Sequence, residues 1–271
     1  MSAIDLSIII VSYNARADLD RCLESIAAAP PRASYEVIVV DNASTDGSAD
    51  IARRHGVRVI ETGANLGFAR ANNAGIRAGS GTDVLLLNSD TLVPAGTLDA
   101  LLQELHRRPD VAVVGPRLVD LEGRGELSFG KMIGPLNELR QKRLVVGHDR
   151  RDPDTSRRVE QLTRQEHYPD WVSGACLLVR RADAEAVDLL DERYFMYTED
   201  VDFCASIRAR GRRILFTPAV EMVHLRGRSA AAAPAATRQA YDRSRLAFYE
   251  KHHPMWAPLL RLYLRSRRAD I

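Results

Sequence analysis

LSIIIVSYN, at residues 6–14, decides the fold, because a nearly unbroken apolar run ends abruptly in polar residues. Leu6–Val11 predicts a buried strand, since a strand that is covered on both faces is apolar on both faces. Two similar runs follow, YEVIVVDNASTDG at residues 35–47 and DVLLLNSD at residues 83–90. Each of them also ends in Asn, Asp or Ser, so the sequence predicts a set of buried strands with polar residues at one end.

Helical patterns separate these strands. Up to residue 120 we expect strands at 6–11, 35–40, 58–61, 83–87 and 111–114, and helices at 15–29, 48–55, 68–78 and 95–107. Strands that alternate with helices at this spacing form right-handed βαβ units. The predicted fold class is therefore α/β, with a Rossmann-type, mostly parallel central sheet and helices on both faces.

The alternation stops after residue 120. Residues 121–168 are rich in charge and poor in periodicity, and a loop of this length in a compact domain is usually a functional lid or a mobile segment. Later we expect a strand at 171–180, a helix at 201–210 and a strand at 213–216. The alanine-rich segment 229–236 contains a proline and predicts a flexible linker before a basic, helical C-terminal tail.

The composition excludes several classes of protein. With 271 residues, 45% of them hydrophobic and a net charge of +2, the chain is that of an ordinary globular protein with no polyanionic partner such as nucleic acid. Its three cysteines form no CxxC pair, which argues against a zinc site or a disulfide framework. We find no signal-peptide pattern and no apolar run of the roughly 20 residues that span a bilayer, so we expect a cytoplasmic location.

The polar ends of the strands predict a ligand site. Ligands of a parallel α/β sheet bind beyond the carboxyl ends of its strands. Any single cluster of Asn, Asp and Ser is more readily a turn or a helix cap, but three clusters at one edge favour a site. No GxGxxG or GxxxxGK[ST] motif is present, which argues against a dinucleotide-binding dehydrogenase and a P-loop nucleotidase.

An ordered set of motifs extends this prediction. The runs SIIIVSYN, VIVVDNASTDGS, GANLGFARANNAGI and LLLNSD, followed by WVSGACLLVRR, FMYTEDVDFC and VHLRGRS, resemble the family 2 glycosyltransferases with the GT-A fold. The similarity is greatest to their bacterial rhamnosyltransferase-like branch. It implies a catalytic domain at residues 1–230, with a nucleotide-sugar and metal half at 1–120 and an acceptor and base half at 121–230. Residues 231–271 would be the linker and the tail.

The resemblance also assigns roles to individual residues. The donor nucleotide-sugar would contact a set of residues from the first half of the chain: Tyr13, Asn14, Asp41, Asn42, Asn65, Gly67, Phe68, Asn72, Asn88 and Ser89. Asp90 would bind Mg²⁺ or Mn²⁺, although Asn88 stands where a full DxD motif has its first acid. His224 would reach the metal or the diphosphate, and Trp171 and Gly174 would form the acceptor side.

The implied reaction is inverting transfer of a sugar, with rhamnose as a candidate, from a dTDP- or UDP-sugar to a hydroxyl of a saccharide or lipid-linked acceptor. Asp200 would be the general base, because an acceptor hydroxyl is a poor nucleophile until a carboxylate takes its proton. Its neighbour Glu199 is the alternative base. A non-catalytic sugar-nucleotide-binding module and a nucleotidyltransferase are the alternative functions.

Simpler interpretations remain for single residues. Thr198, followed by two acids, is also a good helix N-terminus, and His224 after an apolar strand is often structural. The basic tail, with Trp256 and several leucines, fits contact with the inner face of a cell membrane. It equally fits a helix packed on the catalytic domain or on a second subunit of a homodimer.

Overall fold

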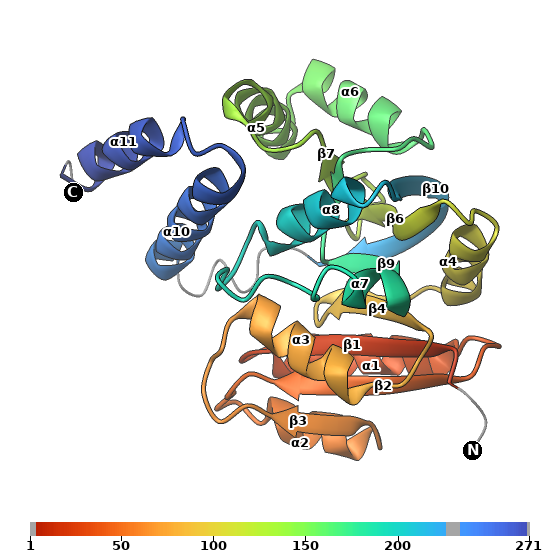
Figure 1. Cartoon of the computed structure of the whole chain (residues 1–271). Coiled ribbons are helices and arrows are strands. Elements are labelled where there is room, and N and C mark those ends of the chain that lie inside the picture. Colours follow the sequence, from red (N-terminus) through yellow and green to blue (C-terminus); the bar gives the residue numbers. More distant parts are fainter. Residues whose placement is uncertain (1–3, 226–233, 270–271) are drawn as a thin grey trace.

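The computed structural model describes residues 4–225 and 234–269. Its central feature is an eight-stranded sheet in the order β3-β2-β1-β4-β9-β6-β10-β5 (Figure 1). The strands of this sheet are β1 (Leu6–Ser12), β2 (Tyr35–Asp41), β3 (Arg58–Glu61), β4 (Asp83–Asn88), β5 (Thr91–Leu92), β6 (Val111–Val119), β9 (Cys176–Arg180) and β10 (Arg213–His224). A two-stranded sheet pairs β7 (Phe129–Gly130) with β8 (Trp171–Val172).

Most neighbouring strands are parallel, as the sequence predicts. β1 pairs in parallel with both β2 and β4, and β10 pairs in parallel with β6. The exceptions are β9, which is antiparallel to β4 and β6, and β5, which is antiparallel to β10. The two halves of the chain therefore share one continuous sheet, and β9 joins them.

Helices cover both faces of the sheet. The helices of the described residues are α1 (Arg16–Ala28), α2 (Ser48–Arg54), α3 (Phe68–Ala78), α4 (Thr97–His106), α5 (Pro135–Asp149), α6 (Pro153–Thr163), α7 (Arg181–Glu185), α8 (Glu199–Ala209), α10 (Pro234–His252) and α11 (Ala257–Ala269), of which α5, α10 and α11 lie away from the sheet (Figure 1). None of these helices is both long enough and apolar enough to cross a membrane.

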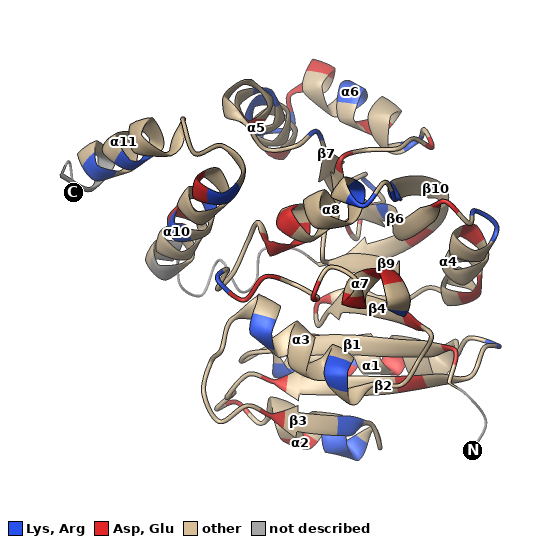
Figure 2. Ribbon diagram, in the orientation of Figure 1, with Lys and Arg blue, Asp and Glu red and all other residues tan. Residues whose placement is uncertain are grey.

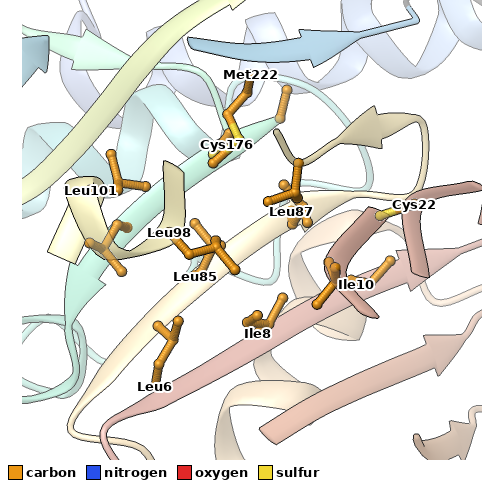
Figure 3. Packing of buried hydrophobic residues seen from close by; sticks show 14 of the residues in the cluster. Leu6, Ile8, Ile10, Cys22, Leu85, Leu87, Leu98, Leu101, Cys176 and Met222 are labelled. Atoms are coloured by element: carbon orange, nitrogen blue, oxygen red, sulfur yellow. The ribbon is translucent and has the colours of Figure 1, made fainter. Parts of the chain in front are cut away.

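Two apolar clusters hold the helices against the sheet. Ile8 and Ile10 point to the face that α1 and α4 cover, and Ile9 points to the face of α3 and α8. Figure 3 shows the first cluster, where Leu85 of β4 lies among side chains of β1 and α4. Since alternate residues of β1 are buried on opposite faces, its unbroken apolar run is explained by the two layers of helices.

The segment predicted as one strand at 171–180 is two strands. β8 ends at Val172 and β9 begins at Cys176. Between them, the backbone N–H of Gly174 donates to a side-chain oxygen of Asp200 at 2.9 Å, so this backbone faces the start of α8 instead of a neighbouring strand. The prediction of a single strand was therefore wrong, because an apolar pattern does not show which sheet each half joins.

Residues 121–168 contain the helices α5 and α6, which the sequence analysis did not predict. None of the residues of α5 is buried, so the helix has no apolar stripe that would mark it. α6 carried a local signal that was overlooked, because Pro153 begins the helix and the Asp152 side chain caps it by accepting from Thr155 N at 2.8 Å. Whether this segment is mobile stays a prediction.

The tail forms α10 and α11 and packs on the catalytic domain. Phe248 and Tyr249 of α10 and Leu260 of α11 are buried in one cluster with Tyr194 and Val201. Figure 1 shows α10 beside the start of α8, with α11 lying beyond α10. α11 still exposes Leu259, Leu262 and Tyr263, so membrane contact stays a prediction. The predicted linker at 229–236 lies largely outside the described residues.

Candidate active site

A cavity of about 1010 Å³ lies beyond the carboxyl ends of β1 and β4. It extends past the start of α8 to side chains from α5, α10 and α11. The site residues predicted from the sequence that line this cavity are Tyr13, Asn42, Asn65, Gly67, Phe68, Asn88, Ser89, Asp90, Trp171, Gly174, Glu199, Asp200 and His224. The structure therefore brings together residues from both halves of the chain.

Three residues predicted to contact the donor do not line the cavity. Asn14 accepts from Thr45 N at 2.8 Å and so holds the loop after β2. Asn72 is buried and donates to the carbonyl of Phe68 at 2.9 Å, inside α3. Asp41 is buried too, with one carboxylate oxygen on Ser44 N at 3.0 Å and the other without a partner. These side chains hold the backbone of the loop after β2 and of α3, next to the predicted donor side. Their contact with a donor stays a prediction.

A polar network shapes the loop before α3. The Asn42 amide donates to Asn65 Oδ1 at 2.9 Å, and its carbonyl oxygen accepts from Leu66 N at 2.9 Å. The next residue, Gly67, has φ +84°, and a Cβ there would lie 2.3 Å from the carbonyl oxygen of Phe195. Only glycine fits this position, since it tolerates both the positive φ and the close backbone contact. The chain before α3 is thus locked against the segment that leads into α8.

The start of α8 has an unusual backbone. Tyr197 and Thr198 both have positive φ, 69° and 65°, which is costly for residues with a Cβ and rare for a β-branched one. Thr198 is the N-cap residue of α8, as the sequence indicated, but its hydroxyl makes no capping hydrogen bond. This strained turn places Glu199 and Asp200 in the cavity wall. Strained residues of this kind cluster at functional sites.

Two carboxylates occupy this position, and both have a raised pKa. Burial raises the pKa of Glu199, the neighbouring charge of Asp200 adds to the shift, and one Glu199 oxygen has no hydrogen-bond partner. Burial also raises the pKa of Asp200, although the N–H groups of Gly174 and Val201 hold its two oxygens at 2.9 Å each and oppose the shift. A carboxylate whose pKa is raised toward neutrality is suited to accepting a proton from a substrate. Figure 2 shows these acids at the start of α8.

A second polar cluster lies at the end of β4. His224, the last residue of β10, places Nε2 at 3.3 Å from Asp90 Oδ1 and Nδ1 at 2.8 Å from Glu126 Oε2. Burial lowers the pKa of this imidazole, but the hydrogen bonds and charges of Asp90 and Glu126 outweigh it and raise the pKa to about 9. The two acids therefore favour the protonated form of His224 in this structure, and the imidazole lies beside Asp90, where the metal and the diphosphate are both predicted.

Glu126 was missed by the sequence analysis. It lies in the segment without periodicity, and it meets His224, 98 positions further along the chain, only through the fold. The cavity-lining residues of α5, α10 and α11 were missed for the same reason. No motif marks them, since they come together only when the tail packs on the domain.

The residues around Asp90 fit a divalent cation whose remaining ligands come from the substrate. Among the described residues no group of three or more His, Cys, Asp and Glu side chains could hold a metal ion alone. Mg²⁺, however, is commonly bound by one or two carboxylates together with substrate phosphates and water. Asp90, which lines the cavity, supplies such a carboxylate.

Comparisons with known proteins give the family. A family model described as glycosyl transferase family 2 matches residues 7–184. The N-acetylglucosaminyl-diphospho-decaprenol L-rhamnosyltransferase of Mycobacterium tuberculosis is 33% identical, over 97% of this chain and 90% of its own length. The low-salt glycan biosynthesis hexosyltransferase Agl10 of Haloferax volcanii is 26% identical, over 81% of this chain and 67% of its own length.

Solved structures show the same fold. The mannosyltransferase PcManGT from Pyrobaculum calidifontis, in complex with GDP-Man and Mn²⁺, has a TM-score of 0.65 at 21% identity, over 96% of this chain and 69% of its own. S. aureus TarS 1-349, in complex with UDP-GlcNAc, has a TM-score of 0.60 at 20% identity, over 90% of this chain and 66% of its own. The predicted fold and family are confirmed: this chain belongs to the family 2 glycosyltransferases, has the GT-A fold and is a glycosyltransferase of the rhamnosyltransferase-like kind.

Proposed function

We propose that this enzyme transfers L-rhamnose, with inversion, from a nucleoside-diphosphate donor to a hydroxyl of a saccharide that is linked through a diphosphate to a lipid. The 33% identical relative, which matches almost the whole chain, is named as an L-rhamnosyltransferase that acts on N-acetylglucosaminyl-diphospho-decaprenol. The observation that supports the proposal most is the single cavity in which the polar ends of β1 and β4 face the carboxylates of α8.

In this proposal, different parts of the cavity bind the nucleotide, hold the sugar and remove the acceptor proton. The nucleotide lies against the loops after β1 and β2, and the sugar points toward α8. Asp200 takes the proton of the acceptor hydroxyl as that oxygen bonds to the anomeric carbon, and the bond from this carbon to the diphosphate breaks. The Gly174 N–H, 2.9 Å from one oxygen of Asp200, orients the carboxylate for this step. Attack from the side opposite the leaving group inverts the anomeric centre, through a transition state resembling an oxocarbenium ion.

A divalent cation belongs to this proposal. When bound, Mg²⁺ or Mn²⁺ would act as a Lewis acid on the diphosphate. Asp90 would hold it, and the cationic His224 beside Asp90 would contact the same diphosphate.

Product analysis tests the function. The protein is incubated with dTDP-rhamnose, UDP- and GDP-sugars and an N-acetylglucosaminyl-diphospho-lipid acceptor, with Mg²⁺, Mn²⁺ or EDTA. We expect a nucleoside diphosphate and a lipid-linked disaccharide with inverted anomeric configuration, and loss of both with EDTA or in Asp90→Ala. Release of pyrophosphate would identify a nucleotidyltransferase, and donor binding without turnover would identify a binding module.

A further inference from the structure

The same cavity also reaches residues beyond the catalytic carboxylates, from the segment after β7 to α11. We call this part the outer chamber; it is bounded by the loop after β7, by α5, by α10 and by α11. Its apolar lining is Ile133, Leu139, Val145, Tyr241 and Tyr263. The loops after β1, β2 and β4, where the donor is placed, contribute nothing to this lining, so the outer chamber is free to receive the other substrate.

Positive charge collects in the outer chamber without being neutralised. Lys131, Lys142 and Arg238 all line it, and no ion pair to another described residue holds any of them. Arg245 also lines it, but Glu138 neutralises this guanidinium through hydrogen bonds of 2.6 and 2.8 Å. The opposing charge is Asp242, an acid of the same lining with no described ion-pair partner. Three exposed cations and one carboxylate therefore share this lining with apolar side chains and with the polar Asn137 and Gln141 of α5.

The three cations come from separate parts of the chain. Lys131 follows β7, and its carbonyl accepts from the Trp171 indole N–H at 3.0 Å, which places this backbone beside the predicted acceptor side. Lys142 lies on α5 and Arg238 on α10. Unpaired ammonium and guanidinium groups that line one cavity suit phosphate, since each N–H can donate a charge-assisted hydrogen bond to a phosphate oxygen.

We infer that the outer chamber is the acceptor subsite: Lys131, Lys142 and Arg238 bind the acceptor's diphosphate, and the apolar lining binds the first part of its lipid chain. This inference rests on the proposed function and deepens it, because it separates two diphosphate sites. The donor diphosphate lies beside Asp90 and His224, and the acceptor diphosphate lies on the far side of Asp200. The exposed Leu136 and Leu139 on α5 and Leu262 on α11 then offer the lipid a path out of the cavity.

Two acceptors that share a sugar but differ in charge test the inference. One carries the sugar on a diphospho-lipid, and the other is a neutral alkyl glycoside of the same sugar. Lys142→Gln and Arg238→Gln should each raise the KM for the diphospho-lipid about tenfold, the scale of one lost hydrogen bond to a charged group. The KM for the neutral glycoside and the affinity for the donor should stay within twofold of the wild-type values.

The chain offers matched controls. Arg143→Gln removes a charge from α5 outside the cavity lining, and should leave both KM values unchanged. Asp242→Asn removes the opposing charge, and should lower the KM for the diphospho-lipid alone. Thermal unfolding of each variant confirms that it is folded.

The outcomes separate this inference from the function. If the wild-type enzyme transfers no sugar to either acceptor, the proposed function fails. If it uses the diphospho-lipid and Lys142→Gln and Arg238→Gln behave like Arg143→Gln, the acceptor subsite is wrong while the function stands. Equal losses with the charged and the neutral acceptor would also overturn the subsite, because diphosphate recognition predicts a difference between them.

Discussion

At the scale of single residues, the two neighbouring carboxylates that follow the strained turn at the start of α8 differ in their hydrogen-bond partners. Asp200 Oδ2 accepts from Gly174 N, whereas Glu199 is 5% exposed and leaves one oxygen without a partner. Asp200 is thus oriented by the backbone of a separate segment, whereas the backbone hydrogen bonds of Glu199 come only from its own turn, at Tyr197 and Glu199. This difference supports the choice of Asp200 as the base, which the sequence alone left open between the two.

Asp200→Asn should lower the transfer rate about 10²-fold or more, because the amide cannot take the acceptor proton. Donor affinity should change little, since the lost interaction belongs mainly to the transition state. Steady-state kinetics and donor titration measure the two effects. Glu199→Gln is the control; if it is the inactive variant, the role passes to Glu199, and if both variants turn over normally the mechanism is wrong.

The raised pKa of Glu199 predicts a dependence of stability on pH. The pKa rises from 4.5 to about 8 in the folded state, so the folded protein holds this proton more tightly than the unfolded chain does. The stability that this group contributes is complete below about pH 4.5 and is lost as the pH rises through about 8. Glu199→Gln lacks this loss. As the pH rises between these two values, the free energy of unfolding of the variant should therefore increase relative to that of the wild type.

Denaturant unfolding at a series of pH values measures this difference. If the difference in free energy of unfolding between the variant and the wild type does not change with pH, the pKa of Glu199 is not raised in the folded state. Asp200→Asn provides a further check, because the charge of Asp200 is the second cause of the shift. Without it, the loss of stability should still begin near pH 4.5, but it should be smaller and end at a lower pH.

At the scale of elements, a buried acid ties α10 to α8. Asp202, on the first turn of α8, is 1% exposed and accepts from Lys251 Nζ at 2.8 Å and from Tyr194 OH at 3.2 Å. His252 Nε2 lies 2.6 Å from the same carboxylate. Asp202 therefore anchors the tail to the start of α8. The C-terminal helices are thereby attached two residues from the proposed base.

Asp202→Ala should lower the free energy of unfolding by about 3 kcal/mol, since it leaves Lys251 and His252 beside a buried gap. The C-terminal helices should become sensitive to protease before the sheet does. Denaturant unfolding and limited proteolysis check the two effects. Glu250→Gln, which removes an exposed partner of Arg261, is the matched control and should cost less than about 1 kcal/mol. Equal effects of the two substitutions would mean that Asp202 is not the anchor.

At the scale of the whole molecule, α5 is the part of the cavity wall with the weakest attachment. None of its residues is buried, and its described contacts are polar, among them Glu138 with Arg245 and Tyr249, and Gln141 with the Phe129 carbonyl. The neighbouring α6 buries Val159 and Thr163. An element with few buried apolar contacts opens at low free-energy cost. The lid predicted for residues 121–168 is therefore best placed in α5.

Hydrogen exchange tests this placement. In the free enzyme the amides of α5 should exchange faster than those of α6 and much faster than those of β1. Addition of nucleoside diphosphate together with the acceptor should slow exchange in α5 and leave α6 nearly unchanged. Strong protection of α5 without ligand would argue against a lid.

The buried strands and the edge that carries the site could be predicted from local sequence. The apolar runs of β1, β2 and β4 are covered on both faces, and the polar residues that follow each run reach one edge because the strands are parallel. The start of α8 was predicted to within two residues, and most predicted site residues do line one cavity. These features are local, because a strand that is buried on both faces consists of consecutive apolar residues.

Tertiary structure alone decided the features that depend on distant partners. Only the fold brings Glu126 to His224, divides residues 171–180 between two sheets and gives the N-cap residue Thr198 a strained backbone with no side-chain capping bond. The same holds for the tail, whose polar helices gave no sign that Asp202 and Glu138 would hold them against the domain. A buried strand is specified by its own residues, whereas an ion pair is specified by two positions that no local pattern connects.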